Sequence, residues 1–180
     1  MTRDEFAKLA DALKTYYPRE NFLPNPQALE LWFRQLQDLE YMVAEAAIQK
    51  WVATSKWTPT VADIREMALD VTQPMEGDWS TGWEKVQRLI RAKGSYATQK
   101  DMEEALDEIS LKAVRALGWQ KMCGVEGDPN PDADRANFRI IYEAEQKRQR
   151  ETAKMPQRLR DIIHGIIEQH KEVAQIDKTD

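Results

Sequence analysis

The sequence has few of the residues on which reactive chemistry depends. It contains one cysteine, Cys123, and two histidines, His164 and His170, in 180 residues. One cysteine forms neither an intrachain disulfide nor a thiolate-rich zinc site, and its rarity fits a reducing compartment. The two histidines are six residues apart, which places them on different helix faces and misses the four-residue spacing of a helical metal pair. We therefore expect no metal site, and we expect the lone thiol to be packed beside its apolar neighbours.

Glycine is scarce as well, and the seven glycines never form a phosphate-binding pattern. Neither GxxxxGK[ST] nor GxGxxG is present, so an intrinsic ATPase and a dinucleotide site both lack sequence support. The neighbouring carboxylates Glu103–Glu104 and Asp107–Glu108 could supply an acid and a base, but such pairs on a short helix are usually a solvated face. We predict that the protein is not an enzyme and has no catalytic residue, no cofactor and no small-molecule substrate.

Long apolar runs and an excess of positive charge are also missing. A membrane-spanning helix needs roughly 20 consecutive apolar residues, and the first ten residues, MTRDEFAKLA, carry charges where a signal peptide has its apolar core. We expect a cytoplasmic protein with no membrane partner. The net charge of −5 argues against a protein that coats nucleic acid with its whole surface, so any nucleic-acid contact must be local.

What the sequence does have is helical periodicity along its whole length. Apolar residues recur at steps of three and four, and the eight prolines fall mostly between the periodic stretches, which predicts an all-α fold. Several polar residues stand where a helix cap is expected. These caps are Thr2 with Glu5, Asn25 before Pro26, Asp38, Thr60 with Asp63, Thr98 with Asp101, and Asp132 or Asp134.

Breaker-rich segments divide the periodic stretches into two small helical subdomains. Residues 1–70 are predicted to form an N-terminal four-helix unit, and residues 71–79 a linker that contains TQPMEGDW. Residues 80–174 are predicted to form a C-terminal helical domain, followed by a frayed tail at 175–180. A polar loop, GVEGDPNPD, interrupts the second domain between residues 124 and 132.

Six tryptophans are candidates for packing or for binding, because tryptophan contributes large contact areas in cores and at interfaces. Trp32, Trp51 and Trp83 lie within apolar stripes and are interpreted as packing residues. Trp57 and Trp79 lie near predicted breaks, so they are the interface candidates.

The segment from 147 to 160 is a basic patch on an otherwise acidic chain, with Glu151 as its one acid. It is equally compatible with a contact to a phosphate backbone or an acidic protein surface and with a solvated helix end and hinge. Its cations are Lys147, Arg148, Arg150, Lys154, Arg158 and Arg160.

The most regular apolar stripe follows Pro156 and predicts a final amphipathic helix. That helix could dock into a groove on a partner, but packing onto residues 80–145 is the favoured expectation. The stripe consists of Leu159, Ile162, Ile163, Ile166, Ile167 and Val173.

The order of four motifs resembles the N-terminal region of the phage replicative-helicase loader and inhibitor family. The motifs are TYYP, LELWFRQL, YMVAEAAIQKWVATSKW and TPTVADIREMA. The second half, with WSTGWEKVQRLIRAKGSY, VRALGWQKMC and RANFRIIYEA, is similar to longer phage and prophage members. Positions that match the family pattern are Tyr17, Pro18, Trp32, Pro59, Ala62, Asp63 and Ile64.

The resemblance implies an adaptor without an ATPase of its own, acting in the cytoplasm of a bacterial host. Its partners would be the hexameric replicative helicase of the host, which it restrains, and an origin-bound phage initiator, to which it delivers that helicase. Shorter members are thought to use a flexible C-terminal part for the helicase, whereas this C-terminal half is strongly patterned. Two alternatives stay open. One is an inhibitor of another nucleic-acid machine such as a CRISPR nuclease, and the other is a DNA-binding accessory protein using the 147–160 patch.

Overall fold

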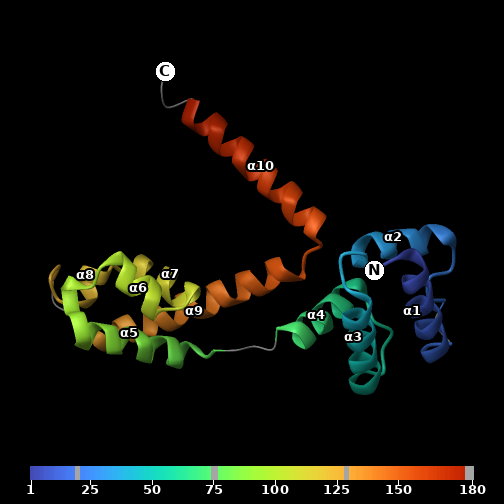
Figure 1. The fold of residues 1–180 in the computed structure, drawn as a ribbon, viewed down its shortest axis with the longest axis horizontal. Helices are drawn as coiled ribbons and strands as arrows, with labels where there is room; N and C mark the ends of the chain where they lie inside the picture. The colour runs from blue at the N-terminus through green and yellow to red at the C-terminus, as the bar shows by residue number, and fades with distance from the viewer. Residues whose placement is uncertain (19–20, 74–76, 128–129, 177–180) are drawn as a thin grey trace. The chain divides into compact units, whose positions relative to one another are not determined.

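The computed structural model describes residues 1–18, 21–73, 77–127 and 130–176. Across these residues the chain forms ten α-helices and one short 3-10 helix, with no strand, so the predicted all-α fold is confirmed (Figure 1). None of the described helices combines the length and the apolar character needed to cross a membrane. The predicted linker, polar loop and tail include residues 74–76, 128–129 and 177–180, which lie outside the described residues.

Contacts divide the chain into two compact units that differ from the subdivision expected from the sequence. Unit 1 comprises Met1–Met75 together with Glu151–Asp180, and unit 2 comprises Glu76–Arg150. The sequence placed residues 80–174 in one C-terminal domain, whereas the structure groups residues from Glu151 onward with the N-terminal helices. The reason is a set of polar contacts, described below, which a hydrophobic pattern does not reveal.

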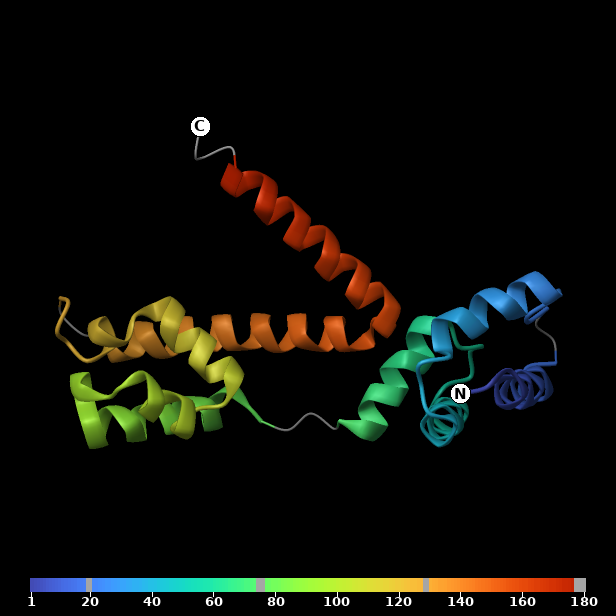
Figure 2. The ribbon, with the colours of Figure 1, turned by 45° about the horizontal axis from the view of Figure 1, so that its top comes forward.

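Unit 1 is built from α1 (Arg3–Tyr16), α2 (Pro26–Leu36), α3 (Tyr41–Thr54) and α4 (Val61–Thr72). The predicted capping boxes at Thr2 and Thr60 are both formed, and the Asn25 side chain accepts a hydrogen bond from Ala28 N–H. Helices α3 and α4 pack side by side (Figures 1 and 2). Their apolar faces form a core together with those of α1 and α2. Helices this short are only marginally stable in isolation, so they depend on this mutual burial. The buried members are Phe6, Leu9, Ala10, Leu13, Leu23, Leu36, Ala44, Ala47, Ile48, Ile64 and Ala68.

The predicted cap at Asp38 is wrong. The residue at the N-cap of α3 is Glu40, which makes no side-chain capping hydrogen bond. The Asp38 carboxylate instead binds the guanidinium of Arg65 in α4. In the bidentate pair both partners are charged, whereas a carboxylate cap would accept from a neutral amide, so Asp38 is used for a tertiary contact.

Unit 2 contains α5 (Trp79–Lys93), the 3-10 turn η1 (Gly94–Tyr96), α6 (Gln99–Ala105), α7 (Glu108–Leu117) and α8 (Trp119–Met122). Helix α9 (Pro131–Lys154) runs on into the first residues of unit 1 at Glu151. The capping box at Thr98 is confirmed, and α6 and α7 are separate helices. The start of α9 is capped by Asn130, whose side chain accepts from Ala133 N–H at 3.1 Å, and not by Asp132 or Asp134 as expected. The core consists of Val86, Leu89, Ala97, Leu106, Ala113, Val114, Trp119, Met122, Phe138 and Tyr142.

The close approach of α5, α7 and α9 depends on Gly82. A Cβ at this position would lie 2.6 Å from Ser110 Oγ and 3.1 Å from Tyr142 Cε2. Ser110 is fully buried and its hydroxyl donates to Asp107 at 2.9 Å, so it has little room to move. We expect Gly82→Ala to lower the free energy of unfolding of unit 2 by about 1–3 kcal/mol through overpacking, measured by urea denaturation.

Gly165 in α10 (Gln157–Ile176) is the matched control, because a Cβ there meets nothing within 4 Å. Gly165→Ala is expected to raise helix content slightly, since glycine in a helix costs about 0.5–1 kcal/mol relative to alanine. Equal stability of Gly82→Ala and the wild type would contradict the close packing of these three helices.

Candidate partner-binding site

The polar centre of unit 1 is Arg65, a buried side chain on α4 with 6% of its surface exposed. Its Nη1 donates to the Gln35 carbonyl at 2.7 Å and to Asp38 Oδ1 at 2.8 Å, and its Nη2 donates to Asp38 Oδ2 at 2.9 Å. Its Nε donates to the carbonyl of Lys154. The planar fork of arginine suits this bidentate arrangement, in which each of its three nitrogens has an acceptor.

The same pair holds the start of α10. The Gln157 N–H, in the first turn of α10, donates to Asp38 Oδ2 at 3.1 Å. Lys154 Nζ forms an ion pair with Glu66 of α4 at 3.0 Å. We call Asp38, Arg65, Lys154 and Gln157 the α10 anchor. It joins a helix near the C-terminus to the N-terminal helices through charged hydrogen bonds, with a half-buried Met155 and Pro156 at the corner.

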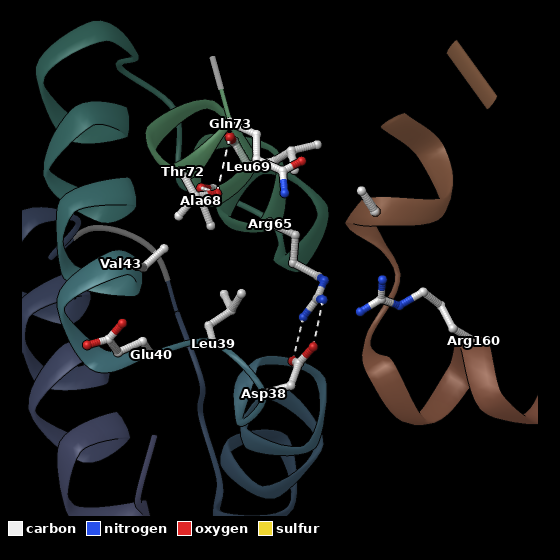
Figure 3. A pocket seen from close by; sticks show the side chains of 11 residues that line it. Asp38, Leu39, Glu40, Val43, Arg65, Ala68, Leu69, Thr72, Gln73 and Arg160 are labelled. Atoms are coloured by element: carbon white, nitrogen blue, oxygen red, sulfur yellow. Dashed lines mark hydrogen bonds and ion pairs between the residues drawn. The ribbon is translucent and has the colours of Figure 1, made fainter. Parts of the chain in front are cut away.

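A pocket of about 240 Å³ lies beside the anchor (Figure 3). Arg160 points toward the Arg65–Asp38 pair from the segment that begins α10. Its Nη2 donates to Gln157 Oε1 at 2.6 Å, whereas its Nε is buried without a hydrogen-bond partner. Apolar side chains such as Leu39, Val43 and Leu69 line the rest of the pocket. The three nitrogens of Arg65 already donate hydrogen bonds within the protein. We therefore interpret the pocket as part of the contact between α10 and the N-terminal helices, and not as a substrate site.

Beyond the anchor, α10 extends from the corner with none of the described helices of unit 1 lying along it (Figures 1 and 2). Every residue from 161 to 170 is exposed. Within unit 1 its apolar face is uncovered, and the expectation that this helix packs onto residues 80–145, which belong to unit 2, stays a prediction. Exposed fractions of that face run from 36% to 49%, for Leu159, Ile162, Ile163, Ile166 and Ile167. A continuous apolar face of this kind typically marks an interaction surface.

The predicted basic patch is divided between the two units. Lys147, Arg148 and Arg150 belong to unit 2, where Arg148 pairs with Glu145 at 2.6 Å. The remaining three cations belong to unit 1. Lys154 is part of the α10 anchor, Arg160 donates to Gln157 of that anchor, and Arg158 is exposed. The structure therefore assigns local structural roles to part of this patch.

The two tryptophans expected at interfaces have different surroundings. Trp57 is 69% exposed, with Lys56 Nζ lying 5.2 Å from its ring centre, and its carbonyl accepts a hydrogen bond from the Trp51 indole. Trp79 is half-buried at the start of α5 and packs against the core of unit 2. Trp32 and Trp83 pack against Phe22 and Phe138, as expected of core aromatics.

Two titratable side chains of unit 2 have raised pKa values. Burial raises the pKa of the Cys123 thiol, which disfavours the reactive thiolate. Burial also raises the pKa of Tyr142, and the charges of Asp107 and Asp78 act in the same direction. Within the described part of the chain, no three His, Cys, Asp or Glu side chains gather in a way that could hold a metal ion.

The pKa of Asp38 gives a pH test of the anchor. Burial acts to raise it, but the hydrogen bonds from Arg65 and Gln157 and the charge of Arg65 outweigh burial, so the pKa lies below its usual value. A carboxyl with a lowered pKa in the folded state stabilises the fold above its unfolded pKa of about 3.9, and this contribution is lost as the pH falls through the folded value. We expect Asp38→Asn to be less stable than the wild type at pH 7, and the gap to narrow below about pH 4.

Urea midpoints of both proteins at neutral and acidic pH measure this gap. Other acids, such as Glu30, whose pKa is lowered to about 2 by hydrogen bonds from Arg3 and Arg34, are present in both proteins. Their titration therefore cancels in the comparison. A gap that stays constant down to pH 3 would show that Asp38 makes no charge-dependent contribution.

These features define a class of protein: a small helical domain that anchors an exposed amphipathic helix. Residues 1–65 match the family model for the N-terminal domain of the gene 39 protein, a phage helicase loader. The resemblance to the phage helicase loader and inhibitor family is thereby confirmed for this part of the chain. No curated protein and no solved structure matches the chain. The matched segment includes both Asp38 and Arg65, whereas Lys154 and Gln157 lie outside it.

The sequence contains one signal for the anchor beyond its apolar periodicity. Arg65 stands four residues after Val61 and three before Ala68, on the stripe that faces the core. A charged side chain on such a stripe needs a partner, because an unpaired buried charge is costly. The pattern could thus have predicted a buried ion pair, although not that its partner would be Asp38.

Proposed function

We propose that this protein is an adaptor that binds the hexameric replicative helicase of a bacterial host and regulates the loading of that helicase onto DNA. The observation that carries the proposal is the match of residues 1–65 to a domain of the helicase loader and inhibitor family. The adaptor acts by binding and has no catalytic activity of its own. Recruitment of a helicase needs protein-binding surfaces and no reactive group.

The apolar face of α10 is the surface that we assign to the helicase. It carries five large aliphatic side chains that are at least 36% exposed. Burying each of them would contribute roughly 1–2 kcal/mol, because each is already partly covered. The anchor gives this helix a fixed origin on the N-terminal domain, which reduces the ordering entropy that a free peptide would lose on binding.

The remaining surface of unit 1 is available to a second partner, for which we propose an origin-bound phage initiator. Among the described residues, Trp57 has the largest exposed fraction of any tryptophan, and Lys56 lies over its ring. Tryptophan is enriched among the residues that dominate binding energy at interfaces. Separate faces for helicase and initiator would allow the adaptor to hold both at once. Exchange between them would then follow from helicase states of different affinity.

The direct test mixes the purified full chain with the purified replicative helicase of its host, with and without ATP. Size-exclusion chromatography with light scattering is expected to show a complex, and the chain is expected to change the helicase's unwinding rate on a forked substrate. The chain alone is expected to hydrolyse no ATP. Absence of a complex in both nucleotide conditions would refute the proposal. A pull-down from host lysate with the full chain as bait would also refute it if a nuclease were recovered in place of the helicase.

A further inference from the structure

Unit 2 carries a tryptophan, Trp79, whose ring lies close to two arginine side chains. The guanidinium carbons of Arg135 and Arg139 lie 5.4 Å and 5.2 Å from the ring centre of Trp79. The three side chains border an open hollow of about 650 Å³. Ile140, on the rim of this hollow, is 64% exposed. The hollow therefore offers flat apolar surfaces next to two guanidinium groups, with the carboxylates of Asp132 and Glu143 also in its lining.

The positive charge continues along α9 away from this hollow. Arg135, Arg139, Glu143 and Lys147 follow one another at steps of four, and Arg150 comes three residues later, so all five lie along one side of the helix. The row extends over roughly 22 Å at 1.5 Å per residue. Its one acid, Glu143, pairs with Arg139 at 2.8 Å. We call Arg135, Arg139, Lys147 and Arg150 the α9 basic row.

Arg135 is the member of this row best placed to meet a ligand. Its side chain is exposed, and across the residues that the structure describes it forms no ion pair with a carboxylate. Its observed interaction is the contact with the Trp79 ring. An arginine stacked on an aromatic ring keeps its edge donors available for phosphate oxygens while its plane remains suited to stacking.

We infer that Trp79 and the α9 basic row bind single-stranded nucleic acid, independently of the helicase contact. A splayed base can stack in the hollow against Trp79 and the guanidinium planes, and the phosphates that follow lie along the row of cations. Duplex DNA suits the site less well, because its bases are stacked inside the helix. The net charge of −5 confines such binding to a local surface, and the row is a local surface of this kind.

The test uses the full chain and a fluorescein-labelled oligothymidylate, with anisotropy measured over a range of salt concentrations. The wild type is expected to bind at low salt, with a log–log salt slope no steeper than about −3, the value for four cations on a single strand. Arg139 is paired with Glu143, and Lys147 and Arg150 also have interactions within the protein. Trp79→Ala is expected to weaken binding about 10-fold through loss of stacking. Arg135→Glu is expected to weaken it at least as much and to make the salt slope shallower.

Arg115→Glu is the matched control, because Arg115 is an exposed arginine of α7 that pairs with Glu103 away from the row. It makes the same charge change and is expected to bind like the wild type. Trp79→Ala could destabilise unit 2, because Trp79 packs against its core. Arg135→Glu changes a surface side chain, so it tests binding without this complication. A duplex of the same sequence is expected to bind more weakly than the single strand.

Failure of the wild type to bind the single strand at low salt would overturn the inference. Equal losses in Arg135→Glu and Arg115→Glu would also overturn it, because the effect would then be one of net charge. If the oligonucleotide does not bind and Arg135→Glu instead weakens the helicase complex, the row is a protein contact. The proposed helicase adaptor would survive each of these results.

Discussion

The double substitution Ile162→Asp/Ile166→Asp is expected to weaken binding to the replicative helicase by about 100-fold or more. The two side chains lie four residues apart on the exposed apolar face of α10. Each replacement removes roughly 1–2 kcal/mol of apolar burial and places a carboxylate where the partner would have to desolvate it. Every 1.4 kcal/mol is tenfold in affinity, so about 2–4 kcal/mol of lost burial and the desolvation of two carboxylates together reach at least two decades. Isothermal titration calorimetry with purified helicase measures the change.

His164→Asp is the matched control for this variant. His164 is two residues from both Ile162 and Ile166, so it points to the opposite side of the helix. It is exposed, as are the two isoleucines, and none of the three substitutions disturbs a core. His164→Asp is expected to bind within about twofold of the wild type. Unchanged affinity of the double variant would exclude the α10 face as the helicase surface.

The second large effect is expected at the anchor. Arg65→Met removes a guanidinium that satisfies the Asp38 carboxylate and the carbonyls of Gln35 and Lys154. Breaking a buried pair leaves its partner uncompensated and typically costs about 3–5 kcal/mol. Because the Asp38 side chain is still 23% exposed, we expect the lower end of that range, a loss of about 3 kcal/mol in the free energy of unfolding of unit 1. Urea denaturation followed by circular dichroism measures it.

Arg3→Met supplies the comparison for the anchor variant. Arg3 also pairs with a carboxylate, that of Glu30, but its side chain is 67% exposed. Exposed ion pairs contribute little because water and salt screen them. The unfolding midpoint of Arg3→Met is therefore expected to stay close to that of the wild type. Equal losses in the two variants would mean that burial of Arg65 does not determine its contribution.

Local features of the fold were predictable from the sequence because they depend on neighbouring residues. The caps at Thr2, Asn25, Thr60 and Thr98 lie within three residues of the amides that they bind. The core positions of α1 to α4 follow from the spacing of their apolar residues. These are short-range interactions, so the local sequence is sufficient to predict them.

The long-range arrangement was not predictable in the same way. Asp38 and Arg65 are separated by 27 residues, and Asp38 and Gln157 by 119. The local sequence around Asp38 is the same whether this residue caps a helix or pairs with a distant arginine. From the local sequence alone, the cap is therefore the expected role. The stripe of α10 likewise determines which residues share a face, whereas what covers that face depends on partners outside the local sequence.

Some residues of the candidate site were named from the sequence, but their grouping in the folded chain was not. The isoleucine face of α10 was identified, and partner docking was one of its two expected uses. The basic patch was treated as one feature, yet Lys154 belongs to the anchor and Arg160 binds Gln157 beside it. Lys147 and Arg150 lie in unit 2 on the α9 basic row. Trp79 was identified as an interface candidate from its position near a break. Its two arginine neighbours, 56 and 60 positions later in the sequence, came from the tertiary structure.

Hydrogen–deuterium exchange of the full chain, alone and with saturating replicative helicase, tests the central claim most directly. Alone, the amides of residues 161–170 are expected to exchange faster than those of α3 and α4, because a helix without packing opens readily. With helicase present, we predict strong protection of residues 161–170. Unchanged exchange in this segment, combined with protection elsewhere on a stable complex, would contradict the assignment of α10 as the helicase-binding helix.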